Sequence, residues 1–148
     1  SRATDKWRSE AVNRPEAQLI GVMYAGDPVD SDIVTKDAEH WVFANTGLKT
    51  GDKLKGLLGY EVDCVSDVAN TAAQILAESP WTALNDNSQQ GVAHMSIYTA
   101  ASGVMVFATG SIQWAWGLDD YNAPVLRTSR LNLAAQQITR NVLKRFLP

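Results

Sequence analysis

A single long amphipathic helix is predicted in this chain, over residues 131–146 at its C-terminal end. Apolar side chains recur there at the spacing of one helix face: Leu131, Ala135, Ile138, Val142 and Phe146. Asn132 is the expected N-cap, because its side-chain oxygen can accept an otherwise unpaired backbone N–H. A doubly wound sheet needs helices on both faces. One long helix therefore predicts that this α/β chain is only part of a larger domain.

The rest of the chain consists mainly of short apolar runs bounded by Gly, Pro and Asn, a pattern typical of strands and turns. Strands are predicted over residues 17–24, 33–35, 56–65 and 74–78, with turns at 25–28 and 79–80. Asp37 is the expected cap of a short helix over residues 38–44.

A β-hairpin is the clearest local signal after the helix. Residues 94–100 and 104–110 are rich in strand-forming side chains, and residues 101–103 join them. Gly103 in that connection can adopt the positive φ of a tight turn. An aromatic loop over residues 111–121 follows. Strands closed by a final amphipathic helix predict an α/β layer, and we treat residues 1–148 as one segment.

Composition and charge fit a soluble globular protein of one domain. The 148 residues are 45% hydrophobic and 20% charged. The net charge is -3 and the basic residues are scattered, unlike the concentrated basic face of a nucleic-acid-binding protein. No run approaches the ~20 apolar residues that a membrane helix needs. We therefore expect neither nucleic acid nor a membrane as a partner, and the cytoplasm is the favoured compartment.

The cysteine count and the N-terminal residues carry two further expectations. Cys64 is the only cysteine, which excludes an intrachain disulfide and a Cys-based metal site. The N-terminal stretch is polar and has neither an initiator Met nor the apolar core of a signal peptide. We expect the chain to begin inside a longer gene product.

Five stretches of the chain together resemble the C-terminal domain of the N,N-dimethylformamidase large (beta) subunit family. They are residues 14–22, 40–49, 56–63, 106–119 and 132–146. The most distinctive run is Gln113-Trp114-Ala115-Trp116-Gly117-Leu118-Asp119.

The resemblance implies a fold, an activity and partners. The fold would be the C-terminal part of a class I glutamine-amidotransferase-like (flavodoxin-like) domain, similar to ThuA-like proteins, with a hairpin and a closing helix. The activity would be hydrolysis of small amides at a mononuclear iron held by two tyrosines and a glutamate upstream of this segment. The resemblance therefore implies no cofactor or metal ligand within this chain. It also implies that the upstream part of the same domain, or another subunit, is the partner.

Glu61 is the predicted catalytic residue. If Tyr60 packs inward, Glu61 points to the opposite face, because side chains alternate along a strand. A carboxylate near the end of a strand is well placed in the crevice of an α/β domain. Glu61 can act as general base for an attacking water or orient a metal-bound water. The alternative is a solvated or salt-bridged strand residue. Tyr60 beside it is a candidate substrate-binding residue.

The aromatic loop supplies most of the other candidate substrate-binding residues. Trp114 and Trp116 alternate, so in an extended segment they share a face and can line a pocket, although large aromatics more often fill a core. Gln113 offers both a donor and an acceptor to a ligand. His94 is a further polar candidate.

Two functions remain open from the sequence. The first is the C-terminal fragment of an amidohydrolase acting on C–N bonds of small amides, inactive alone. The alternative is a catalytically silent, glutamine-amidotransferase-like binding or structural module that presents its aromatic surface to a sugar or a protein partner. A complete small hydrolase is disfavoured, because no Ser-His-Asp or Cys-His arrangement and no nucleophile elbow is legible.

Overall fold

Strands form most of the regular structure in the computed structural model, which describes residues 4–69 and 72–147. A two-stranded sheet contains β1 (Val22–Val34) and β2 (Lys53–Val65). A three-stranded sheet contains β3 (Gln74–Thr82), β4 (Gln90–Thr99) and β5 (Met105–Ala108), in that order. The helical elements are α1 (Ala17–Ile20), the 3₁₀ segments η1 (Trp41–Phe43), η2 (Asp67–Ala69) and η3 (Ile112–Gly117), and α2 (Leu133–Phe146).

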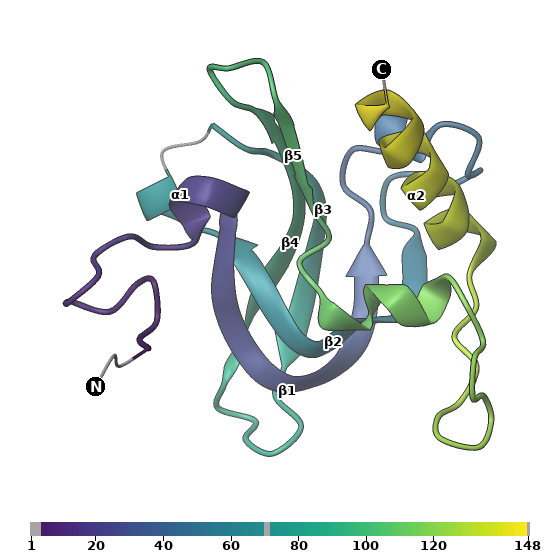
Figure 1. Ribbon diagram of the computed structural model, residues 1–148. Coiled ribbons are helices and arrows are strands. Elements are labelled where there is room, and N and C mark those ends of the chain that lie inside the picture. The colour runs from purple at the N-terminus through teal and green to yellow at the C-terminus, as the bar shows by residue number, and fades with distance from the viewer. Residues whose placement is uncertain (1–3, 70–71, 148) are drawn as a thin grey trace.

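The sheets lie between the two α-helices. In Figure 1 the curved β1–β2 ribbon passes in front of the three-stranded sheet, with α1 on one side and α2 on the other. One apolar core, which includes Leu58, Met95 and Ile138, joins the two sheets and α2. None of the helices in the described part of the chain is long and apolar enough to cross a membrane.

The mixed α/β class is confirmed, together with the hairpin and the closing helix. All three strand pairings found in the described residues, β1 with β2, β3 with β4 and β4 with β5, are antiparallel. A flavodoxin-like sheet is built from parallel strands with helical crossovers. The flavodoxin-like assignment is therefore not confirmed by this part of the chain.

The turn predicted at residues 25–28 is wrong, because these residues lie inside β1. The pairing of β1 with β2 shifts register between Tyr24 and Gly26 and again between Gly26 and Val29, so Gly and Pro mark bulges. Gly26 is required for packing: a Cβ placed there would lie 2.3 Å from the Trp81 ring. The strand predicted at residues 33–35 is the end of this same β1, which stops at Val34.

Other predicted boundaries are also corrected. Residues 17–20 of the strand predicted over 17–24 form the helix α1, and β1 begins only at Val22. β3 continues through Pro80 to Thr82, since it is an edge strand of its sheet and an edge tolerates a missing N–H. The short helix is only η1, and its cap is His40, whose Nδ1 accepts a hydrogen bond from the Val42 N–H at 3.3 Å. Asp37 instead accepts a hydrogen bond from the Gln74 amide at 2.8 Å.

The hairpin forms as predicted from local signals. β4 and β5 pair from Thr99↔Met105 to Ser96↔Ala108. Gly103 takes a φ of 86° in the connection, and the Ala100 N–H donates to the Val104 carbonyl at 2.8 Å. This is the conformation that glycine adopts without a steric penalty.

The closing helix α2 is also confirmed with its predicted cap. The Asn132 side chain accepts a hydrogen bond from the Ala135 N–H at 3.0 Å. Ala135, Ile138 and Val142 are buried, whereas Leu131 and Phe146 at the two ends of the stripe are about half exposed. The helix packs mainly against η1 and η3.

Candidate functional site

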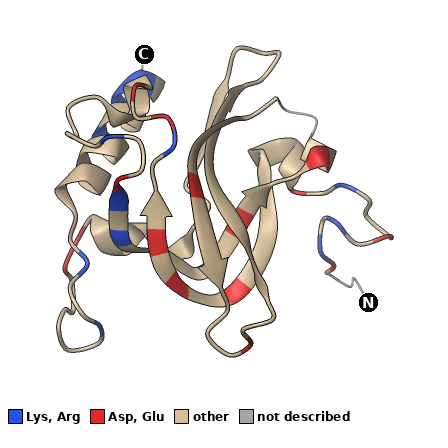
Figure 2. Cartoon of the chain, turned by 180° about the vertical axis from the view of Figure 1, so that it is seen from behind, with Lys and Arg blue, Asp and Glu red and all other residues tan. Residues whose placement is uncertain are grey.

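Glu61 faces a surface depression of about 490 Å³ between the N-terminal segment and the β1–β2 sheet. We call this depression the Glu61 site. Its lining combines carboxylates, cations, one phenol and one apolar side chain: Lys6, Arg8, Glu16, Ile20, Tyr24, Asp27, Glu61 and Asp63. Figure 2 shows the acidic positions along the curved strands and basic positions on the N-terminal segment beside them.

Strand alternation places the three central side chains on one face. Val62 is fully buried in the core, so its neighbours Glu61 and Asp63 both point to the opposite face. Tyr24 lies directly across from Asp63 in the β1–β2 pairing. Opposed residues of an antiparallel pair share a face, so β1 supplies the phenol and β2 the two carboxyl groups.

Asp63 is the electrostatically unusual member of the Glu61 site. Its pKa is raised, first by burial and then by the negative charge of Glu61, while Arg8 acts in the opposite direction. The Tyr24 pKa is also raised, by desolvation and by the hydrogen bond that its hydroxyl donates to Asp27 at 3.1 Å. Burial and the neighbouring Glu61 therefore make the protonated form of Asp63 more favourable than it is for an aspartate in water, which raises the pKa of this carboxyl group.

Arg8 brings the N-terminal segment against the sheet. Its guanidinium forms an ion pair with Glu16 and lies over the Tyr24 ring, 5.5 Å from the ring centre. The second carboxylate oxygen of Glu16 is buried and has no hydrogen-bond partner in the structure. Cations and carboxylates thus line the same depression. The cations can donate hydrogen bonds to the carbonyl oxygen of an amide, and the carboxylates can accept one from an amide N–H.

Iron, implied by the resemblance, does not fit this set of side chains. The described residues contain no group of three His, Cys, Asp or Glu side chains that can hold a metal ion. Tyr24 is the one tyrosine that lines the Glu61 site, and its hydroxyl is engaged by Asp27. We therefore derive no chemical step through iron at this site.

The other predicted substrate-binding residues do not lie in the lining of the Glu61 site. Tyr60 is 56% exposed, so its side chain does not pack into the core. His94 lies on β4, and its Nδ1 accepts a hydrogen bond from the Val65 N–H at 2.9 Å. Burial lowers the His94 pKa, which favours the neutral ring that this hydrogen bond requires. His94 thereby links the two sheets.

Gln113 and Trp114 are buried and bonded to the fold. The Gln113 amide donates to the carbonyls of Gly56 at 3.3 Å and Leu58 at 3.4 Å. The Trp114 indole N–H donates to the Thr139 hydroxyl of α2 at 3.1 Å. Both side chains hold η3 between β2 and the closing helix.

Trp116 does not share a face with Trp114, because residues 112–117 form the 3₁₀ segment η3 and not an extended segment. The Trp116 ring lies near two guanidinium groups, with Arg127 5.5 Å and Arg130 5.2 Å from its centre. Trp116 and the exposed Tyr121 line a smaller depression of about 280 Å³, together with Asn122, Leu126 and Arg127.

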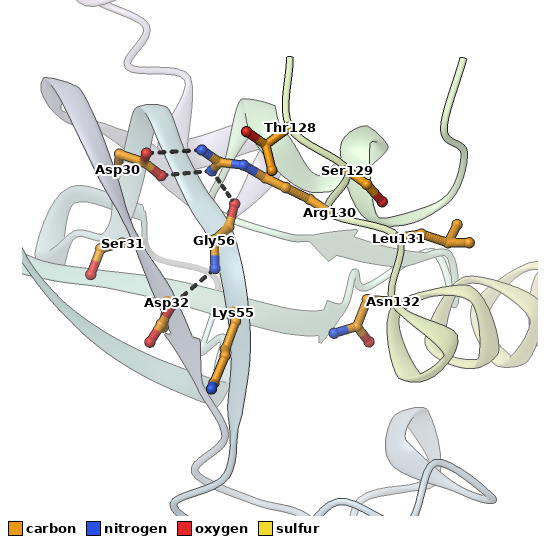
Figure 3. A pocket seen from close by; sticks show the side chains of 10 residues that line it. All are labelled: Asp30, Ser31, Asp32, Lys55, Gly56, Thr128, Ser129, Arg130, Leu131 and Asn132. Atoms are coloured by element: carbon orange, nitrogen blue, oxygen red, sulfur yellow. Dashed lines mark hydrogen bonds and ion pairs between the residues drawn. The ribbon is translucent and has the colours of Figure 1, made fainter. Parts of the chain in front are cut away.

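A second polar depression, of about 510 Å³, was not predicted from the sequence (Figure 3). Arg130 donates to both carboxylate oxygens of Asp30, at 2.6 and 2.8 Å, and to the Gly56 carbonyl at 2.5 Å. Asp32 accepts a hydrogen bond from the Gly56 N–H at 2.9 Å. Figure 3 shows Arg130 reaching across β2 to Asp30 on β1. No local sequence signal joins two residues so far apart in the chain.

Comparison with known proteins gives one match. The sequence model of a family described as "N,N-dimethylformamidase beta subunit-like, C-terminal" matches residues 1–126. No curated protein and no solved structure matches the chain. The matched residues include the whole Glu61 site and end before α2.

Proposed function

Since the chain belongs to the N,N-dimethylformamidase beta subunit-like C-terminal family, we propose that it is the C-terminal part of an amide hydrolase. The proposed reaction is hydrolysis of the C–N bond in small amides such as formamides. The observation that carries this proposal is the position of Glu61, on a strand that faces a depression lined by both carboxylates and cations.

Glu61 is the proposed general base. A carboxylate at this position can take a proton from a water molecule as the water oxygen attacks the amide carbon. The cations Lys6 and Arg8 lie in the same lining and favour the negative charge that develops on the carbonyl oxygen. The site is a depression of the protein surface, so water reaches it.

We propose that the rest of the active site is supplied by the upstream part of the same protein or by another subunit. The family name refers to one subunit of an enzyme, which supports such a partner. An iron-binding group and a glutamine-amidotransferase-like layer would belong to that upstream part. In this proposal the chain closes one side of a shared site and is inactive alone.

A silent binding or structural module is the second candidate function. The observation that favours it is the depression lined by the half-buried Trp116 and the exposed Tyr121, with two arginines beside the Trp116 ring. Such a surface suits a sugar ring or a protein partner, because aromatic faces pack against C–H groups and cations fix polar ones.

One experiment separates the two functions. The full-length protein is incubated with N,N-dimethylformamide, and formate and dimethylamine are measured. Release of the two products in equal amounts supports the hydrolase. No release from this or from other small formamides and acetamides would contradict the hydrolase and favour the silent module.

A further inference from the structure

We propose that Asp63 is the proton donor to the leaving nitrogen, and that it works as a pair with Glu61 on the same face of β2. This inference rests on the proposed hydrolase function and names a second catalytic residue for it. Splitting an amide requires both a base for the water and an acid for the amine, because an unprotonated amide anion is a very poor leaving group.

The geometry of the strand suits a base and an acid acting on one substrate. Glu61 and Asp63 are two residues apart in β2 and both line the Glu61 site. Two residues of a strand span roughly 6–7 Å, at about 3.3 Å per residue. That separation leaves room for a planar amide group, with a water beside one carboxyl group and the nitrogen beside the other.

The surroundings of Asp63 favour its protonated form. Burial is the largest influence and the Glu61 charge adds to it, so the Asp63 pKa is raised. A carboxyl group whose pKa is raised gives up its proton less readily in the resting site and is better suited to act as a general acid. The Tyr24 hydroxyl, which also lines the site, already donates a hydrogen bond to Asp27. Asp63 is therefore the better-placed donor.

Water forms the new C–O bond and gives one proton to Glu61, while the carbonyl π electrons move to the oxygen. As the carbonyl reforms, the C–N bond breaks and its electron pair goes to nitrogen, which takes the proton of Asp63. One water and one amide become one carboxylic acid and one amine. Transfer of the proton from Glu61 to Asp63 restores the starting state.

The test compares two formamides with different leaving amines in the full-length protein. Dimethylamine is a strongly basic amine and leaves only when protonated, whereas 4-nitroaniline leaves without a proton. Asp63→Asn should lower kcat on N,N-dimethylformamide by about 10²-fold or more, the range of general acid catalysis. On the formamide of 4-nitroaniline the loss should be within about tenfold. Glu61→Gln should slow both substrates, because both need the attacking water.

The controls separate this inference from the proposed function. Asp67→Asn, at an exposed aspartate in η2, should leave both rates unchanged. If Asp63→Asn lowers kcat equally on both substrates, or changes both by less than twofold, Asp63 is not the acid. A large loss of kcat in Glu61→Gln in the same experiment would still support the proposed hydrolase function. Unchanged rates in Glu61→Gln would instead overturn the proposed function. If Asp63→Asn does not fold, Asp63→Glu retains an acid and should keep the wild-type ratio between the two substrates.

Discussion

Two aspartates of the β1–β2 sheet show how surroundings set the behaviour of one residue type. The pKa of Asp30 is lowered, chiefly by the hydrogen bonds from Arg130. The pKa of Asp63 is raised, chiefly by burial. Ionisation of Asp30 therefore stabilises the fold, whereas ionisation of Asp63 destabilises it. A buried carboxyl group whose surroundings oppose its ionisation is typical of functional sites and not of surfaces optimised for stability.

Asp63→Asn is predicted to stabilise the protein at pH 7. A raised pKa in the folded state means that ionisation opposes folding, so stability falls as pH rises from the unfolded pKa, near ~3.9, through the folded one. Asn removes this penalty, and its advantage should vanish at low pH, where the wild-type carboxyl is protonated in both states. Chemical unfolding at pH 3 and pH 7 measures the difference. An equal or lower stability of the variant at pH 7 would contradict the assigned burial.

Asp30→Asn is predicted to act in the opposite direction. Because the folded pKa is depressed, the stabilisation is present above the unfolded pKa and is lost as pH falls through the folded one. The pair is partly exposed, with side-chain exposures of 20% for Arg130 and 41% for Asp30, so we expect a loss of only ~0.2–1 kcal/mol. Urea unfolding at neutral pH checks this, with Asp67→Asn as the control. A variant as stable as wild type would mean that Arg130 is held by Gly56 and Trp116 alone.

At the scale of elements, the packing of β1 depends on a close contact between Gly26 and Trp81. Gly26→Ala would place a Cβ 2.3 Å from Trp81 in the core, so the ring or the strand must move. We expect a loss of ~1–3 kcal/mol, typical of overpacking, and a shift in tryptophan emission. Gly51→Ala is the matched control, since nothing lies within 4 Å there and only its φ of 91° opposes a side chain. A smaller loss of stability for Gly26→Ala than for Gly51→Ala would contradict the close contact between Gly26 and Trp81.

The elements that could be predicted from the sequence are those fixed by local signals. The helix α2 follows from its apolar stripe and Asn132 cap, and the β4–β5 hairpin follows from two strand-forming runs around Gly103. The course of β1 could not be predicted, because a Gly beside Asp and Pro locally indicates a turn. The contact with Trp81 that requires Gly26 within the strand is visible only in the folded chain.

The candidate site could be predicted only in part, because contacts between distant segments leave no local signal in the sequence. Glu61 was singled out on its strand, and Asp63 beside it follows from alternation alone. Arg8, Glu16 and Tyr24 come from other segments, and only the folded chain brings them to β2. Trp114 and Trp116 were expected to share a face, but η3 is helical and separates them. Distant pairs such as Asp30 with Arg130 leave no local pattern.

In the whole molecule, the Glu61 site lies between the N-terminal segment and the β1–β2 sheet, on the side of α1. The match to the family covers all of this site. In our proposal an upstream part or another subunit completes it, so activity belongs to the assembled protein and not to this chain.

The chain expressed alone is therefore predicted not to hydrolyse formamides, even with added iron. Formate release is the measurement, and a cooperative thermal unfolding transition of the same sample serves as the control for folding. Turnover by the isolated chain that a chelator abolishes would show that the metal site lies within these residues.

The most direct test of the account is the kcat of the full-length protein with Glu61→Gln, measured on N,N-dimethylformamide. Gln keeps the shape and the hydrogen-bonding reach of the side chain but cannot take a proton. We expect kcat to fall by about 10²–10⁴-fold, with an unfolding curve within about half a kcal/mol of wild type. Glu78→Gln, at a glutamate of β3 paired with Lys36, should retain full activity. A kcat within twofold of wild type in Glu61→Gln would contradict the account.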